Sequence, residues 1–184
     1  MSDVADRYLN LARQFGARVD AAADDAWDNP SPCEGWSARD VVKHVVDMQH
    51  RLAWRIQGSD GEPADLPAGF DPKAAWSTSY REIEDALNQP GALEKTVPGP
   101  MGDMPIEFAV GRIYAADVLV HTWDLARAVG GDERLDPDAV AQAFKGYQPM
   151  DAMIRQPGVF GPKVEPPAGA DEQTRFLCFI GRRP

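Results

Sequence analysis

The sequence of 184 residues has little cysteine, and its two cysteines, Cys33 and Cys178, are far apart. Neither belongs to a C-x-x-C pair, which excludes a disulfide framework and a zinc finger built from cysteines. This cysteine usage is typical of a reducing compartment, so we predict a cytoplasmic location. The start of the sequence lacks a basic segment followed by an apolar run, and no apolar stretch approaches the roughly 20 residues of a membrane-spanning helix. We therefore expect neither export nor membrane insertion.

Basic residues are also scarce, because 19 Lys and Arg stand against 29 Asp and Glu, which gives a net charge of -10. Nucleic-acid binding depends on basic side chains that neutralise phosphates, so this charge argues against a nucleic-acid partner. The same sign disfavours binding to an anionic membrane surface. With 43% hydrophobic residues, the chain is long enough to bury one core, and we predict a single domain over residues 1–184.

The hydrophobic pattern of the sequence is mainly that of α-helices. Apolar residues recur every three or four positions in several long segments, which are separated by stretches rich in proline, glycine and aspartate. The segment from Thr96 to Pro105 alternates turn residues with short apolar ones, which indicates a hairpin-like insertion, and its prolines restrict the pairing to a sheet edge. These patterns predict an all-α protein, an antiparallel four-helix bundle with a short C-terminal helix. The segments expected to be helical are 3–27, 38–57, 71–90, 105–130, 136–154 and 171–181.

The helix predicted at 105–130 has polar side chains on the face that packs into the core. Spacings of three and four residues place seven positions on that face, namely Ile106, Val110, Ile113, Asp117, His121, Asp124 and Ala128. Burying a carboxylate and an imidazole without compensation costs on the order of several kcal/mol. A divalent metal ion would provide that compensation.

His44 is the second histidine expected to face the core, because it shares the apolar stripe of helix 38–57 with Val41 and Val45. His50, six residues later, lies on a different face and is predicted at the surface. In helical bundles, metal sites are built from inward side chains of facing helices. Two histidines and a carboxylate leave coordination positions open for water or substrate, as catalytic zinc and non-haem iron sites do.

A simpler interpretation competes with the metal site. A histidine on an apolar face is more often a hydrogen-bonded core residue than a ligand, and His121 could do no more than hydrogen-bond Asp124 across one helical turn. We therefore assign Asp124 as a hydrogen-bond partner of a ligand before we consider it a ligand. Likewise, Cys33 is predicted to be a small buried residue, and Trp36 a core or groove aromatic rather than part of a cofactor site.

Two separated motifs add a resemblance to a known family. The segment Cys33–His44 reads C-E-G-W-S-A-R-D-V-V-K-H, and the segment Asp117–Arg127 reads D-V-L-V-H-T-W-D-L-A-R. They resemble the C-x-G-W-(S/T)-x-x-D-(L/V)-x-x-H opening and the (E/D)-x-x-x-H-x-W-D-L-A-R helix of the DinB-like superfamily, in its mycothiol-dependent maleylpyruvate isomerase N-terminal-domain branch. The tail, from Phe160 to Arg182, resembles stand-alone members that are often labelled only as metal-binding proteins.

The resemblance implies a DinB/YfiT-like bundle whose four helices run up, down, down and up. It implies a divalent metal ion, zinc or alternatively nickel, bound by His44, Asp117 and His121. It also implies chemistry that depends on a thiol, mycothiol, as in a transferase or isomerase. A small-molecule thiol or substrate is then the expected partner, and a homodimer is left open.

This sequence departs from the isomerase pattern in two respects. The isomerase has a glutamate where this sequence has Asp117, whose side chain is shorter by one methylene. The isomerase also carries a further C-terminal domain with substrate-binding residues, and we expect none after Pro184. Two alternatives to a thiol-dependent enzyme stay open, a non-catalytic metal or small-ligand binding protein whose metal only stabilises the bundle, and a metal-dependent hydrolase.

Overall fold

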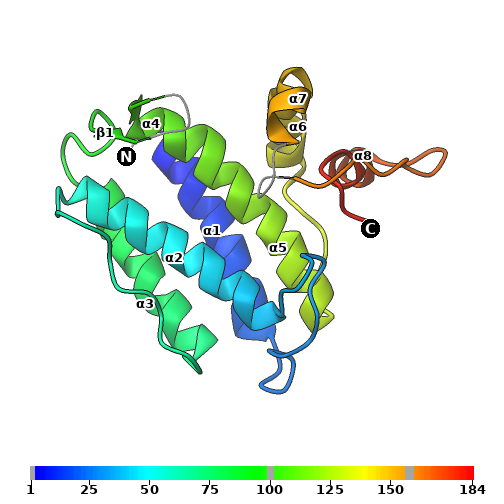
Figure 1. The fold of residues 1–184 in the computed structure, drawn as a ribbon, viewed down its shortest axis with the longest axis horizontal. Coiled ribbons are helices and arrows are strands. Elements are labelled where there is room, and N and C mark those ends of the chain that lie inside the picture. The colour runs from blue at the N-terminus through cyan, green and yellow to red at the C-terminus, as the bar shows by residue number, and fades with distance from the viewer. Residues whose placement is uncertain (1–2, 99–101, 156–159) are drawn as a thin grey trace. The chain divides into compact units, whose positions relative to one another are not determined.

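The computed structural model describes residues 3–98, 102–155 and 160–184, and its regular structure is almost entirely helical (Figure 1). The predicted all-α class is confirmed. No helix within the described ranges is long and apolar enough to cross a membrane. The elements are α1 (Asp3–Ala21), α2 (Ala38–Ile56), α3 (Pro72–Leu87), β1 (Thr96–Val97), β2 (Met104–Pro105), α4 (Ile106–Ala109), η1 (Val110–Tyr114), α5 (Ala115–Val129), α6 (Pro137–Tyr147), η2 (Gln148–Met150), α7 (Asp151–Ile154) and α8 (Glu172–Phe179).

The chain forms two compact units, Met1–Glu133 and Arg134–Pro184. The first unit contains α1 to α5 and the two strands, and it includes every residue predicted to bind metal. The second unit contains α6, α7 and α8, and the ring of Phe144 packs there against those of Phe176 and Phe179. That the whole chain is one domain stays a prediction.

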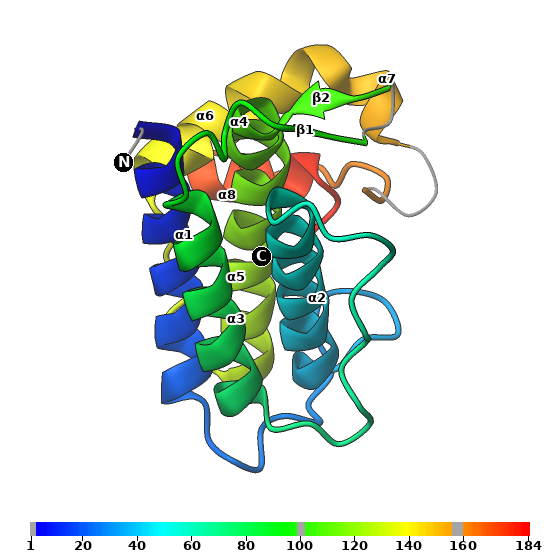
Figure 2. The ribbon, with the colours of Figure 1, turned by 90° about the vertical axis from the view of Figure 1, so that its left-hand side faces the viewer.

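The four long helices of the first unit form a bundle, which Figure 2 shows from the side. α1 and α5 run in one direction and α2 and α3 in the other, because the connection at 57–71 returns along the bundle before α3 begins. This is the up, down, down, up order that the resemblance implied. α2 therefore packs against both α3 and α5, which brings the two helices with the sequence motifs together.

Local sequence sets where the helices begin and end. Ser37 and Asp40 form a capping box at the start of α2, in which the Asp40 backbone N–H donates to Ser37 Oγ (3.3 Å) and the Ser37 N–H donates to the Asp40 carboxylate (2.8 Å). Asp71 caps α3 immediately before Pro72. α5 ends at Gly130, whose φ of +69° lies in the left-handed region that favours glycine.

The predicted hairpin is present as two short antiparallel strands. Thr96 pairs with Pro105, and Val97 pairs with Met104. The tip predicted between the strands falls on residues 99–101, which lie outside the described residues.

Two predicted helices are shorter than expected. α1 ends at Ala21 rather than near residue 27, because Asp24 and Asp25 would place negative charge at the negative end of the helix dipole. The helix expected over 136–154 is divided into α6, η2 and α7, because Pro149 lacks the N–H that would continue the helical hydrogen bonds.

A π turn, η1, interrupts the helix that was expected to be continuous over 105–130. The Ala115 N–H donates to the carbonyl of Val110, five residues back instead of four. The extra residue rotates the preceding turns relative to α5, so Ile113, predicted in the buried stripe, is only half-buried. The spacing of Asp117 and His121 is unaffected, because both lie in α5 after the π turn.

Gly16 allows α1 to approach α3 closely, which leads to a stability prediction. A Cβ at Gly16 would overlap Nε1 of Trp76 and lie 3.1 Å from its Cε2, and the indole is fixed against Phe15 at a centroid distance of 4.9 Å. We expect Gly16→Ala to lower the free energy of unfolding by about 1–3 kcal/mol in urea denaturation, because overpacking a rigid core costs that much.

A control separates this clash from helix propensity. Ala17→Gly, at the exposed neighbouring position, should cost about 1 kcal/mol through propensity alone. By propensity, Gly16→Ala would instead stabilise the protein. An unchanged or higher unfolding free energy for Gly16→Ala would mean that Trp76 moves aside.

Candidate metal centre

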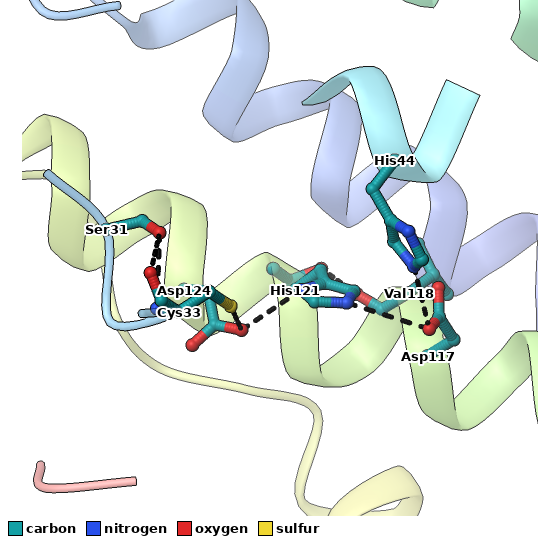
Figure 3. A network of polar contacts seen from close by, with 8 residues as sticks. Ser31, Cys33, His44, Asp117, Val118, His121 and Asp124 are labelled. Carbon is teal, nitrogen blue, oxygen red and sulfur yellow. Dashed lines mark hydrogen bonds and ion pairs between the residues drawn. The ribbon is translucent and has the colours of Figure 1, made fainter. Parts of the chain in front are cut away.

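The three residues that the sequence predicted as ligands converge between α2 and α5 (Figure 3). Nε2 of His44 lies 3.2 Å from Oδ1 of Asp117, and Nε2 of His121 lies 3.6 Å from the same oxygen. One donor atom from each of the three residues lies within 4.8 Å of the others. The structure thus brings His44 of α2 next to Asp117 and His121 of α5, although Asp117 follows His44 by 73 positions in the sequence.

The site extends from the surface of the bundle into its interior. The exposed fraction of the side chain falls from 30% for His44 and 24% for Asp117 to 10% for His121. His44 is therefore the donor that solvent or a small molecule reaches first, while His121 is set against the core.

Asp124 is fully buried and forms the hydrogen bond with His121 that the sequence predicted, while its role as partner of a metal ligand stays a prediction. Its Oδ2 lies 3.0 Å from Nδ1 of His121, on the opposite side of the imidazole from Nε2. If Nδ1 carries the proton that this contact favours, Nε2 keeps its lone pair and faces Asp117. A carboxylate placed this way fixes the tautomer that metal binding needs.

Helical periodicity did not indicate that Cys33 belongs to this network. Its thiol donates to Asp124 Oδ2 at 3.3 Å, and the side chain is half-buried rather than buried as predicted. The two residues are 91 positions apart, so no periodic pattern links them. The available signal was the order of the two motifs, because Cys33 opens the first and Asp124 lies in the second.

The charged forms of Asp117 and His121 are stabilised by each other and by their neighbours in the site. Burial raises the pKa of Asp117, but the charge of His121 and the hydrogen bond with His44 outweigh burial and lower that pKa below its usual value. Burial likewise lowers the pKa of His121, but Asp117 and the contacts with Asp124 and Cys33 raise it to about 10. The residues therefore stabilise a positive charge at the position of His121.

Trp36 covers the imidazole rings. Its indole stacks on His121 with ring centroids 5.8 Å apart and an angle of 20°, and it lies 5.2 Å from the ring of His44. A short turn fixes the indole, since the Ser31 N–H donates to the Trp36 carbonyl (2.8 Å) and Gly35 adopts a φ of +77°. Trp36 is thus a wall of the site, in agreement with its prediction as a groove aromatic.

A hollow opens beside His44. It has a volume of about 400 Å³ and is lined by Gly35, Trp36, Asp40, Lys43, His44 and Asp47. The ammonium of Lys43 lies 2.6 Å from Oδ2 of Asp47 on the next turn of α2. A small polar molecule in this hollow would contact the exposed edge of His44.

The donor geometry fits a divalent ion. Donors that lie roughly 2.0–2.2 Å from a tetrahedral zinc ion are about 3.3–3.6 Å apart, close to the 3.2 Å and 3.6 Å found around Asp117 Oδ1. Two imidazoles and one carboxylate also suit nickel or iron. That these residues bind an ion stays a prediction.

Comparisons with known proteins agree with the resemblance. Residues 8–126 match the family model described as the mycothiol maleylpyruvate isomerase N-terminal domain, a range that contains all four residues of the predicted site. Two uncharacterized proteins of Mycobacterium tuberculosis, from two strains, are each 30% identical over 175 residues, which cover 91% of this chain and 91% of each relative.

Solved structures agree on the fold. Two crystal structures of the mycothiol-dependent maleylpyruvate isomerase, one of them a histidine-to-alanine mutant, superpose on this chain with TM-scores of 0.57 and 0.59. The matches cover 85% of this chain and 73% of the isomerase chain at 16% identity. At that identity they establish the shared fold alone.

Proposed function

The chain belongs to the mycothiol maleylpyruvate isomerase N-terminal domain family, and from this premise we propose that it binds a divalent metal ion, zinc in the first place, through His44, Asp117 and His121. We further propose that the ion takes a low-molecular-weight thiol as an additional ligand, and that the protein is a thiol-dependent transferase or isomerase. The observation that carries the proposal is the convergence of three donor atoms on one point from two helices.

The charged surroundings of His121 support the proposed binding of a metal ion. Asp117 and Asp124 lie 3.6 Å and 3.0 Å from the two ring nitrogens of His121, and these carboxylates favour a proton on the imidazole. A divalent ion would replace that proton and satisfy the same carboxylate, and it would release the proton on binding. The proposal therefore explains why an imidazole and two carboxylates are placed side by side inside a helical bundle.

The remaining residues prepare the site for a ligand. A bound divalent ion would act as a Lewis acid that favours the thiolate form of a coordinated thiol. Asp124 orients His121, Trp36 shields the imidazole faces, and the hollow beside His44 offers space for a small polar thiol. The isomerase that shares this fold depends on mycothiol, so mycothiol is the thiol that we propose for this chain. A cytoplasmic location belongs to the same proposal, because such thiols stay reduced there.

A titration with thiol tests whether the site has an open position. We expect 2-mercaptoethanol or mycothiol to produce a new near-ultraviolet charge-transfer band in the cobalt-substituted protein, because thiolate coordination to cobalt gives bands that oxygen ligands do not. Ethylene glycol, which has the same shape without sulfur, should leave the spectrum unchanged. An unchanged absorption spectrum at saturating thiol would contradict the thiol-dependent function and would favour a metal ion that only stabilises the bundle.

A further inference from the structure

Cys33, Asp124 and His121 form a continuous chain of hydrogen bonds that ends at the candidate metal centre (Figure 3). Oδ2 of Asp124 is the shared atom, because it accepts from the Cys33 thiol at 3.3 Å and lies 3.0 Å from Nδ1 of His121. The other ring nitrogen of His121 faces Asp117 at 3.6 Å. A displacement of the shared oxygen would therefore turn the imidazole that points at the donor set.

The loop before α2 holds the thiol in place. The Cys33 N–H donates to Ser31 Oγ (3.2 Å), and the Cys33 carbonyl accepts from the Trp36 N–H (3.0 Å). Asn29 Nδ2 donates to the carbonyl of Ala128 (3.1 Å), which ties the same loop to the last turn of α5. The thiol is thus fixed relative to the helix that carries Asp124.

Asp124 depends on its hydrogen-bond donors because its side chain has no exposure to solvent. A buried carboxylate cannot replace a lost donor with water, so each donor helps to determine where the carboxylate lies. Groups that orient a metal-binding histidine in this way influence metal affinity without touching the ion.

We propose that Cys33 is a positioning residue of the metal centre, whose thiol holds Asp124 and, through it, the ligand His121. The inference rests on the proposed metal site. Cys33 donates to Asp124, which contacts Nδ1 of His121, whereas Nε2 of His121 faces Asp117 and, beyond it, His44. The thiol is therefore placed to orient the ligand rather than to bind the same ion.

Three substitutions at position 33 separate donation from packing. Cys33→Ser keeps a donor, Cys33→Ala removes it and leaves space, and Cys33→Val removes it while filling that space with a side chain one heavy atom larger than cysteine. We expect the alanine and valine variants to bind zinc about 10–100-fold more weakly in competition with a chromophoric chelator, the range found when partners of metal ligands are removed. Their cobalt d–d bands should shift as well, while Cys33→Ser should stay close to the parent in both measurements.

Two results would overturn the positioning role. One is parental affinity and an unshifted cobalt spectrum in both Cys33→Ala and Cys33→Val. The other is a sulfur-to-cobalt band in the parent protein without added thiol that disappears in Cys33→Ser, because Cys33 would then be a ligand itself. Cys178→Ala, which removes the thiol of the second unit, is the matched control and should change neither property.

A further readout does not depend on the metal. The imidazole nitrogen resonances of His121 in the metal-free protein should change in Cys33→Ala and Cys33→Val but not in Cys33→Ser. If the parent protein bound no metal, the proposed function would fail, and this comparison would still decide whether Cys33 positions His121. Unchanged resonances in both variants that lack the donor would reject the inference.

Discussion

Purified without chelators or nickel resin, the protein should contain about one divalent ion per chain, and replacing either His44 or His121 with alanine should remove it. The three donors come from two helices, so the loss of one imidazole leaves only one imidazole and a carboxylate. We expect the affinity to fall by more than about 100-fold, since even partners of ligands are worth roughly 10–100-fold. Elemental analysis of the purified variants measures this directly.

The third histidine provides the matched control. His50 also lies on α2, but its Nε2 is 3.2 Å from Oε2 of Glu82 on α3, away from the donor set. His50→Ala should therefore retain the full metal content. Full occupancy in both His44→Ala and His121→Ala would eliminate the proposed ligand set.

Local periodicity was sufficient to predict the polar face of α5. Asp117, His121 and Asp124 recur at spacings of four and three, and within a regular helix that spacing alone places them on one face. The capping residues Ser37 and Asp71 were predictable for the same reason, because a cap is formed by neighbours in sequence.

Contacts between distant segments could not be predicted in this way. The sequence pattern did not single out Gln49 on α2, yet it is buried, donates to Tyr8 Oη (3.1 Å) and accepts from Ser79 Oγ (2.5 Å). His50 was predicted at the surface and is half-buried against α3. Such burial depends on which helices pack together, and composition and spacing do not contain that information.

The π turn was missed for a different reason. The residues of Val110–Tyr114 do not disfavour an α-helix strongly enough to indicate an inserted residue. The helical pattern was therefore predicted to continue through this segment. Periodicity placed His44 and Asp117 on the inward faces of their helices. That these two helices pair and share one site was implied by the family resemblance.

Asp117 is where this chain differs from the isomerase pattern, and it gives the second large effect. Its Oδ1 lies 3.2 Å from Nε2 of His44 and 3.6 Å from Nε2 of His121, so its charge should contribute strongly to holding an ion. We expect Asp117→Asn to weaken zinc binding by at least about 10-fold in chelator competition, because the amide keeps the shape but loses the charge that offsets the ion. Asp117→Glu restores the longer carboxylate of the isomerase pattern and should keep or strengthen the affinity.

The bundle should survive both changes, so metal affinity can be compared between folded proteins. Its stability derives mainly from apolar side chains with no exposure to solvent, such as Val41, Leu52, Ile106 and Val110, rather than from the site. Helical circular dichroism and urea denaturation of both variants provide the check. If Asp117→Asn bound zinc as tightly as the parent at neutral pH, Asp117 would not be a ligand. Asp124 or an external group would then have to complete the site.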